Sequence, residues 1–282
     1  MKARIVAPSS KLGELNNLQT GLELLASWGI RLELPQISDR SWGYLAGSDQ
    51  ERLADFDGSA DLWACARGGW GAARLLELNW QPPQGLLLGF SDITSLLWAM
   101  QLKRFSGINQ SALQGALHGP LVTTLAAEPT WSQERLRRLL LGDAVPALQG
   151  IPWGGGIAEG PLLVANLTVA THLLGTPWCP DLAGAVLILE DVGEAPYRID
   201  RMLTHWRLCG ALQKLAAIGF GSFSDCGEGD AAEQVLQERT ANLGIPRLTG
   251  LPVGHGSGNA VLPLGKIARL DGDKGVLSLA PF

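Results

Sequence analysis

The sequence predicts an α/β protein with a doubly wound, mostly parallel sheet in its N-terminal part and a smaller α/β domain in its C-terminal part. Two observations lead to this fold class. Short apolar runs alternate with amphipathic segments over connections of only a few residues, a pattern typical of βαβ units. Hydrophobic residues make up 46% of the 282 residues, enough to bury a core on both faces of a sheet.

The first 120 residues show this alternation most clearly. Strands are expected at residues 3–8, 30–35, 61–69 and 85–90. Helices are expected at residues 18–29, at residues 72–79 and from residue 91 onward. Gly29 ends the first helix and Pro35 stops the second strand. The order of elements predicts a flavodoxin-like N-terminal domain over residues 1–120.

Residues 121–160 interrupt the pattern because they are rich in proline and glycine. We interpret them as a connecting segment with one helix, at residues 131–142. A C-terminal domain is expected over residues 161–282. Its predicted elements are a helix from residue 166, a strand at 185–190, a helix around 198–215, a strand at 218–224, a helix at 231–244 and short final strands.

Charge and composition exclude several classes of protein. The net charge is −5 and no basic run suits a phosphate backbone, so nucleic acid is not an expected partner. No apolar run approaches the roughly 18 residues of a membrane span, and the N-terminus lacks a secretory signal. The four cysteines lie far apart without a CxxC pair, so no metal site is expected. The sequence therefore predicts a cytoplasmic protein that binds neither nucleic acid nor membrane.

Ser91 lies where a predicted strand turns into a helix, in the stretch "LLLGFSDITSLLWAM" (residues 86–100). It is either a helix cap or a nucleophile displayed on a tight turn. The surrounding residues resemble the G-x-S-x-G nucleophile elbow but lack its last glycine.

A serine nucleophile needs a base, and His255 is the most suggestive of the four histidines. It lies in "LPVGHGSGN", a glycine-rich loop that can approach a ligand closely. His118, in "LHGP", is either structural or part of a cleft, while the other two histidines lie in helical patterns. A buried strand ends at Glu190-Asp191, which is either an acidic partner for a histidine or a helix cap with a solvated loop.

The stretch "ARGGWGAARLL" places two adjacent glycines directly after a strand. Free amides in such a loop suit an oxyanion hole or a phosphate cradle. The spacing fits neither a P-loop nor G-x-G-x-x-G, which argues against a nucleotide enzyme.

Together these motifs resemble the LD-carboxypeptidase family, the serine peptidase family S66, which includes muramoyltetrapeptide carboxypeptidases and microcin-immunity peptidases. The resemblance covers nearly the whole chain. It is carried by "IVAPSS", "RGGWG", "GFSDIT", "HGP", "EGPLLVANL", "LLGTPWCPDLAG", "LILEDVGEAPYRIDRML" and "GHGSGNAVLPLG".

The resemblance implies a role for each candidate residue. It makes Ser91 the nucleophile, Glu190 the acidic member and His255 the base. The implied oxyanion donors are the amide of Asp92 and an amide of the glycine loop, either that of Gly68 or that of Gly69.

Two departures from the family pattern bear on the substrate. Trp70 replaces the usual tyrosine of the glycine loop, and Val164-Ala165 replaces the usual Gly-Gly before Asn166. A carboxypeptidase must also bind a terminal carboxylate, for which the candidates are Arg67, Arg198 and Arg201.

The resemblance implies an enzyme that removes the terminal D-alanine from cytoplasmic murein tetrapeptides in cell-wall recycling. It implies no metal or other cofactor, and it suggests a homodimer. Two alternatives remain: a peptidase that inactivates peptidyl-nucleotide antibiotics, and a non-catalytic protein that binds muropeptides.

Overall fold

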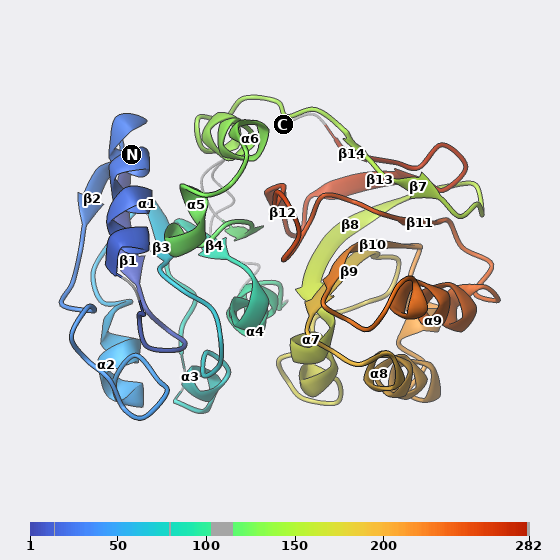
Figure 1. The fold of residues 1–282 in the computed structure, drawn as a ribbon, viewed down its shortest axis with the longest axis horizontal. Helices are drawn as coiled ribbons and strands as arrows, with labels where there is room; N and C mark the ends of the chain where they lie inside the picture. The colour runs from blue at the N-terminus through green and yellow to red at the C-terminus, as the bar shows by residue number, and fades with distance from the viewer. Residues whose placement is uncertain (14, 79, 103–114, 281–282) are drawn as a thin grey trace.

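The computed structural model describes residues 1–13, 15–78, 80–102 and 115–280, which form two sheets lying side by side (Figure 1). The first sheet has the order β12-β5-β4-β3-β1-β2. All its neighbours are parallel except β12, which runs antiparallel to β5. The order β2-β1-β3-β4-β5 is the flavodoxin-like order. The strands are β1 (Lys2–Val6), β2 (Arg31–Glu33), β3 (Leu62–Cys65), β4 (Leu86–Gly89), β5 (Gly115–His118) and β12 (Leu262–Pro263).

Helices cover both faces of this sheet, because successive strand residues point to opposite faces and both sets are apolar. Buried leucines of α1 (Leu15–Ser27), α5 (Val122–Leu125) and α6 (Thr130–Leu140) share one core cluster with alternate residues of β1, β3 and β4. The remaining strand residues pack with α3 (Arg74–Glu77) and α4 (Thr94–Ala99) in a second cluster. The short helix α2 (Asp49–Ala54) precedes β3.

The second sheet has eight strands in the order β6-β14-β13-β8-β9-β10-β11-β7. The four central strands, from β8 to β11, are parallel, and the outer ones are antiparallel. The bounds are β6 (Leu148–Gln149), β7 (Ile151–Pro152), β8 (Ile157–Asn166), β9 (Val186–Val192), β10 (Ala217–Ser224), β11 (Arg247–Thr249), β13 (Ile267–Asp271) and β14 (Val276–Leu279).

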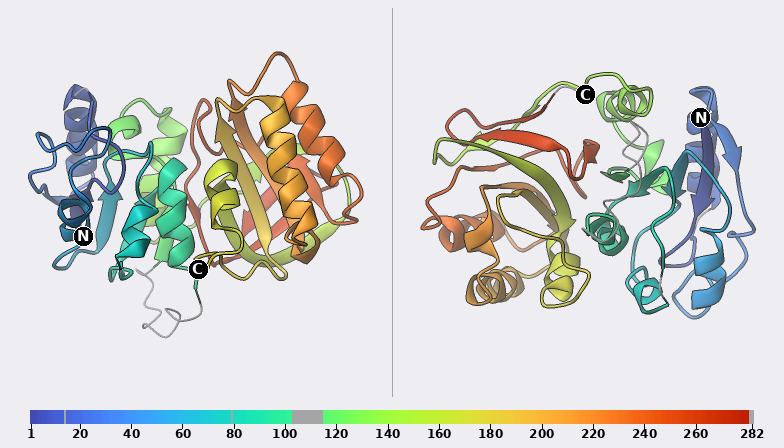
Figure 2. Two further views of the ribbon diagram at one scale, coloured as in Figure 1. Left: turned by 90° about the horizontal axis from the view of Figure 1, so that it is seen from below. Right: turned by 180° about the vertical axis from the view of Figure 1, so that it is seen from behind.

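Three helices lie side by side against the second sheet, as the left view of Figure 2 shows. They are α7 (Leu167–Leu173), α8 (Pro196–Leu208) and α9 (Ala231–Thr240). Leu203 and Trp206 of α8 are buried in the same core cluster as the strands of this sheet. No helix in the described part of the chain is long and apolar enough to cross a membrane.

Helix α4 contacts β8 and α7, and the 3₁₀ turn that precedes it, directly after β4, also contacts β8 (Figure 1). The indole of Trp98 donates to the carbonyl of Val164 over 3.1 Å and meets the ring of Trp206 edge-on. The amide of Asn166 donates to the Thr94 hydroxyl over 3.1 Å. A single core cluster therefore runs from the first sheet through α4 into the second sheet.

The mixed α/β fold class is confirmed, but several elements differ from the expectation. The second sheet has more strands than the first, although the C-terminal part was expected to be smaller. Residues 121–160 hold α5, β6, β7 and the start of β8 besides the expected helix, so they contribute to both units. The helix expected around residues 198–215 ends at Leu208, because Gly210 adopts a left-handed conformation with φ +73°.

Candidate active site

Ser91 lies on a strained turn directly after β4. Its φ is +62°, in the left-handed region that costs a residue with a Cβ roughly 1–2 kcal/mol. Gly89 makes the turn possible, because a Cβ there would lie 2.9 Å from Ile93 Cγ2. No side chain caps the 3₁₀ turn Ser91–Ile93 or the helix after it, so the helix-cap interpretation of Ser91 is wrong. The turn instead presents the hydroxyl at the carboxyl end of the sheet.

The side chain of Asp92 holds this turn through hydrogen bonds to two neighbouring loops. Its carboxylate is buried, and Oδ2 accepts hydrogen bonds from the Ser9 hydroxyl (2.5 Å) and the Ala72 amide (2.8 Å). Burial raises the pKa of Asp92, while these two bonds and the charge of Arg52 partly oppose the shift. The residue after Ser91 thus ties the loops that follow β1 and β3 to the turn.

The glycine loop after β3 lies against Ser91. A Cβ on Gly68 would be 3.1 Å from Ser91 Cβ and 3.3 Å from its Oγ. Gly69 has φ +107°, and a Cβ there would be 2.4 Å from the Ser10 hydroxyl. Among the described residues, the amides of Gly68, Gly69 and Asp92 donate to no acceptor. Such unpaired amides beside a hydroxyl are what an oxyanion hole requires.

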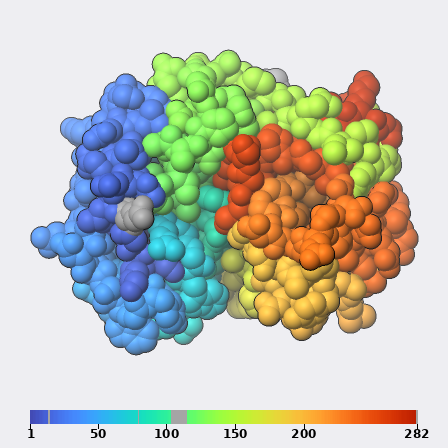
Figure 3. All heavy atoms as spheres, viewed as in Figure 1, coloured from blue at the N-terminus to red at the C-terminus, as the bar shows by residue number. Residues whose placement is uncertain are grey.

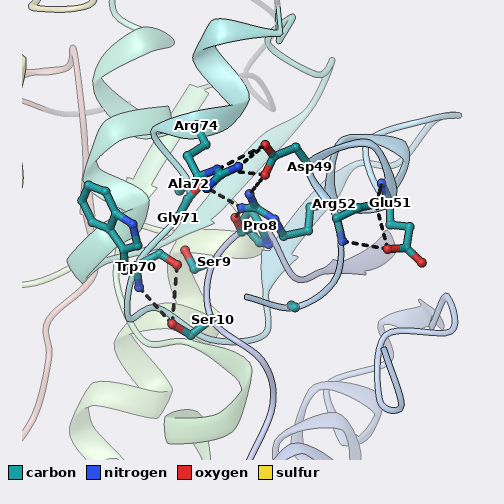
Figure 4. Close-up of polar contacts among 12 residues, drawn as sticks. Pro8, Ser9, Ser10, Asp49, Glu51, Arg52, Trp70, Gly71, Ala72 and Arg74 are labelled. Carbon is teal, nitrogen blue, oxygen red and sulfur yellow. Dashed lines mark hydrogen bonds and ion pairs between the residues drawn. The ribbon is translucent and has the colours of Figure 1, made fainter. Parts of the chain in front are cut away.

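A buried arginine fixes the same two loops (Figure 4). Arg52 is fully buried, donates to the carbonyls of Pro8 and Gly71, and pairs with Asp49. Asp49 also pairs with Arg74 at 2.7 Å. The hydrogen bond from Arg74 is the largest cause of the lowered pKa of Asp49. The sequence did contain a signal for the helix that carries Arg52, because Ser48 and a glutamate three residues later form a capping box.

Glu190 and His255 form a hydrogen-bonded pair at the end of β9. The distance from His255 Nδ1 to Glu190 Oε2 is 2.7 Å. Glu190 is fully buried, and burial raises its pKa although His255 opposes the shift. Burial also disfavours the charged form of His255, but the hydrogen bond and charge of Glu190 outweigh it and raise the pKa of His255 above its usual value of 6.5. This arrangement orients the ring and stabilises its protonated form.

The loop that carries His255 is held from both ends. At Gly254, whose φ is +100°, a Cβ would lie 2.4 Å from Glu190 Oε2, so only glycine fits beside the carboxylate. The Gly254 amide donates to Asn259 Oδ1 over 2.9 Å. The Asn259 amide in turn donates to Glu128 over 2.7 Å, just before α6. In Figure 3 the chain after residue 250, in orange-red to red, lies against the green segment around α5 and α6.

The ring of Phe90 brings the Ser91 turn to His255. Its centroid lies 4.7 Å from that of His255 and 5.7 Å from that of His118. No hydrogen bond is found between the Ser91 hydroxyl and His255 among the described residues, and the Phe90 ring contact links the two segments. His118 is fully buried, and burial together with the charge of His255 lowers its pKa to about 3. It is therefore a neutral, buried residue that packs against Phe90.

The predicted substrate-binding residues do not form one group. Trp70 is 45% exposed on the glycine loop, where its amide donates to the Ser10 hydroxyl over 3.0 Å. Arg67 donates to the carbonyl of Lys11 over 2.8 Å. Arg198 and Arg201 lie together on α8, beside the second sheet. The replaced pair Val164-Ala165 is buried in β8 and serves packing.

The sequence analysis named Asp191 only as one member of the Glu190-Asp191 pair and missed the residues that bind it. Asp191 accepts from Asn166 Nδ2 (2.9 Å) and from both the amide (2.9 Å) and the hydroxyl (2.8 Å) of Thr168. The available signal was the Asn-x-Thr start of a helix, because Asn166 also caps α7. Trp131, 43% exposed, packs against Gly258 in the His255 loop, and no sequence pattern marks that contact. Within the described chain, no cluster of three or more His, Cys, Asp or Glu residues could hold a metal ion.

Comparison with protein families and known proteins finds matches over nearly the whole chain. Residues 3–110 match the LD-carboxypeptidase N-terminal domain and residues 159–270 match the LD-carboxypeptidase C-terminal domain. The chain is 47% identical to a putative carboxypeptidase of Synechocystis sp., over 97% of this chain and 92% of that protein. It is 34% identical to the murein tetrapeptide carboxypeptidase of Pseudomonas aeruginosa, over 97% of this chain and 94% of that protein.

The fold is also that of a solved carboxypeptidase. The crystal structure of muramoyltetrapeptide carboxypeptidase from Oxalobacter formigenes superposes with a TM-score of 0.82 at 25% identity, covering 99% of this chain and 98% of that one. Both halves of the chain, the paired sheets and the full-length relatives point to one family of hydrolases. The chain belongs to the LD-carboxypeptidase family.

Proposed function

We propose that this carboxypeptidase is a serine enzyme that removes the C-terminal D-alanine of murein tetrapeptides. The Glu190–His255 pair beside the strained Ser91 turn is the observation that carries the proposal. A relative at 34% identity that is named a murein tetrapeptide carboxypeptidase supports the substrate class. We place the reaction in the cytoplasm, in peptidoglycan recycling, without a cofactor and in a homodimer.

The first step forms an acyl-enzyme. Ser91 Oγ attacks the scissile carbonyl while His255 Nε2 removes the hydroxyl proton. Glu190 stays ionised and stabilises the imidazolium through Nδ1. The oxyanion accepts hydrogen bonds from the Asp92 amide and from an amide of Gly68 or Gly69, each worth roughly 3 kcal/mol to the transition state. The imidazolium then protonates the departing nitrogen of D-alanine.

The second step releases the shortened peptide. Water attacks the acyl carbon while His255 removes its proton, and the same amides stabilise the second oxyanion. Collapse of this intermediate returns the proton to Ser91 Oγ and restores the free enzyme. The scissile bond joins an L-centre of diaminopimelate or lysine to D-alanine.

The test compares the protein with its Ser91→Ala variant on L-Ala-γ-D-Glu-meso-diaminopimelate-D-Ala. Mass spectrometry should detect free D-alanine with the wild type and at least roughly 10³-fold less with the variant. Circular dichroism of both proteins controls for folding. Release at equal rates would exclude Ser91 as the nucleophile, and release by neither folded protein would exclude the substrate.

Trp131 supports a second candidate, a peptidase that cleaves peptidyl-nucleotide antibiotics. Such a substrate needs an aromatic platform for its base, and this half-exposed indole lies next to the His255 loop. Turnover of a peptidyl-nucleotide and of the tetrapeptide is measured in parallel with Trp131→Ala. Faster cleavage of the nucleotide substrate, lost in the variant, would favour this candidate over the murein substrate.

A further inference from the structure

The loop that carries His255 is fixed to the part of the chain that packs on the Ser91 sheet. Helix α6 packs its buried leucines in the core cluster of the first sheet. Just before this helix, Glu128 accepts from the Asn259 amide over 2.7 Å. On the helix, the buried Ser132 hydroxyl donates to the Asn259 carbonyl over 2.9 Å. Both backbone groups of Asn259 are thus held by the segment that covers the first sheet.

The side chain of Asn259 reaches back to the residue before His255. Asn259 is fully buried, and its Oδ1 accepts from the Gly254 amide over 2.9 Å. Only an acceptor atom can face an N–H group, so this bond fixes the orientation of the carboxamide. Its Nδ2 is buried and has no hydrogen-bond partner among the described residues. The Asn259 side chain therefore acts through its oxygen alone.

Gly254 lies directly against the Glu190 carboxylate. A Cβ on Gly254 would be 2.4 Å from Glu190 Oε2, the same oxygen that lies 2.7 Å from His255 Nδ1. No hydrogen bond from Ser91 holds the imidazole from its other side among the described residues. A displacement of the Gly254 amide would therefore change the contact between Nδ1 and Oε2.

We infer that Asn259 is a positioning residue for His255. Through the Gly254 amide it transmits the position of α6, and hence of the sheet that displays Ser91, to the imidazole. Glu128 acts with it by holding the Asn259 amide. This inference rests on the proposed role of His255 as the base, but it predicts a geometric effect that can be measured without turnover.

The titratable groups that act on His255 lie outside these hydrogen bonds. In the described chain they are Glu190 and Asp191 of β9 and the neutral His118 of β5. Asn259 is uncharged, so its replacement alters none of them. A change in the pKa of His255 in an Asn259 variant would arise from a longer contact between Nδ1 and Oε2 and not from a lost charge.

The first experiment compares the wild type with Asn259→Ala on L-Ala-γ-D-Glu-meso-diaminopimelate-D-Ala. The variant is expected to lower kcat roughly 10- to 100-fold with little change in KM, because misplacing the base affects the transition state more than binding. The acid limb of its pH–rate profile should move to lower pH. The physical reason is that a weaker hydrogen bond from Glu190 raises the pKa of His255 less.

The second experiment needs no turnover. In protein that carries isotope-labelled histidine, proton NMR detects the Nδ1 proton between His255 and Glu190, and its loss in His255→Gln assigns the signal. Asn259→Ala should shift this signal upfield and speed its exchange with water, because the hydrogen bond becomes longer and weaker.

Glu128 and α6 provide matched variants. Glu128→Ala should lower kcat and shift the acid limb as Asn259→Ala does, whereas Glu128→Gln keeps an oxygen for the Asn259 amide and should recover most of that loss. Leu139→Ala is the control for stability. It removes a buried apolar side chain from the same helix and should leave the acid limb and the NMR signal unchanged.

An Asn259→Ala variant with the kcat, acid limb and NMR signal of the wild type would overturn the inference and leave the proposed function intact. A loss of kcat that Leu139→Ala reproduces, with the limb unmoved, would overturn it too. If Asn259→Ala does not fold, equal kcat in the two Glu128 variants would decide against it. A folded wild type that releases no D-alanine would overturn the proposed function, and the NMR signal would then decide the positioning role by itself.

Discussion

The backbone of Ser91 is held at φ +62°, where a glycine would rest without strain. Loops that cost free energy in this way persist where the surrounding structure over-determines them, and here Asp92 and Gly89 do so. The strain is thus linked to the display of the hydroxyl.

This strain predicts which of two inactive variants of Ser91 has the higher free energy of unfolding. Both Ser91→Gly and Ser91→Ala should lose activity, but the glycine variant should be the more stable by roughly 1 kcal/mol, because it removes the Cβ from a left-handed residue. Urea denaturation of both proteins measures the difference. A glycine variant less stable than the alanine variant would contradict the strain.

The pair of Glu190 and His255 predicts how activity depends on pH. His255 acts as a base only when neutral, and its raised pKa places the acid limb of kcat/KM above pH 6.5 in the wild type. Glu190→Gln removes the charge that raises the pKa, so the limb should move to lower pH while kcat falls by roughly 10²–10⁴. A pH–rate profile of both proteins measures the shift. A limb at the same pH in the variant would mean that Glu190 does not set the pKa of His255.

At the scale of elements, helix α2 holds the loops that surround Ser91. Its Arg52 is buried against two carbonyls and an acidic partner, and removing one partner of a buried ion pair leaves the others uncompensated. The helix therefore supports the glycine loop, although it lies far from His255 along the chain.

Arg52→Met should accordingly destabilise the protein by roughly 3 kcal/mol and lower kcat more than it raises KM. Denaturant unfolding and steady-state kinetics test the two parts. Arg137→Met provides the exposed counterpart and should change stability by less than about 0.5 kcal/mol. An Arg52 variant as active as the wild type would show that the loops hold without it.

Elements with a strong local pattern could be predicted, and those without one could not. Helix α1 buries Leu18, Leu22 and Leu25 at helical spacing, and its position was predicted to within a few residues. Strand β8 was missed because glycines precede it and Pro161 lies within it, so its start has the composition of a loop. Helix α2 has only six residues, too few for an apolar period to show.

For the whole molecule, the continuity of the core determines how it unfolds. One cluster of buried residues spans both sheets, and α4 contributes Trp98 to it. The C-terminal part of the chain also contributes a strand to the first sheet, because β12 pairs with β5. The division at residues 1–120, 121–160 and 161–282 stays a prediction.

We expect calorimetry to show one cooperative transition, with equal calorimetric and van't Hoff enthalpies, because neither sheet can lose its packing alone. Two resolved transitions would instead mean that the units unfold separately. The measurement uses the whole chain at a pH near neutrality.

The sequence by itself determined the α/β class, the parallel order of the first sheet and the motifs that hold Ser91, Glu190 and His255, because these follow from local apolar periods and short ordered blocks. Only the tertiary structure decided which groups meet. The 2.7 Å contact of Glu190 with His255, the support from Asp92 and Arg52, and the hydrogen bond of Asn259 to Glu128 join residues far apart in the chain. Such contacts depend on how the turn after β4 packs against β8, which pairs with β9, and this packing leaves no local pattern in the sequence.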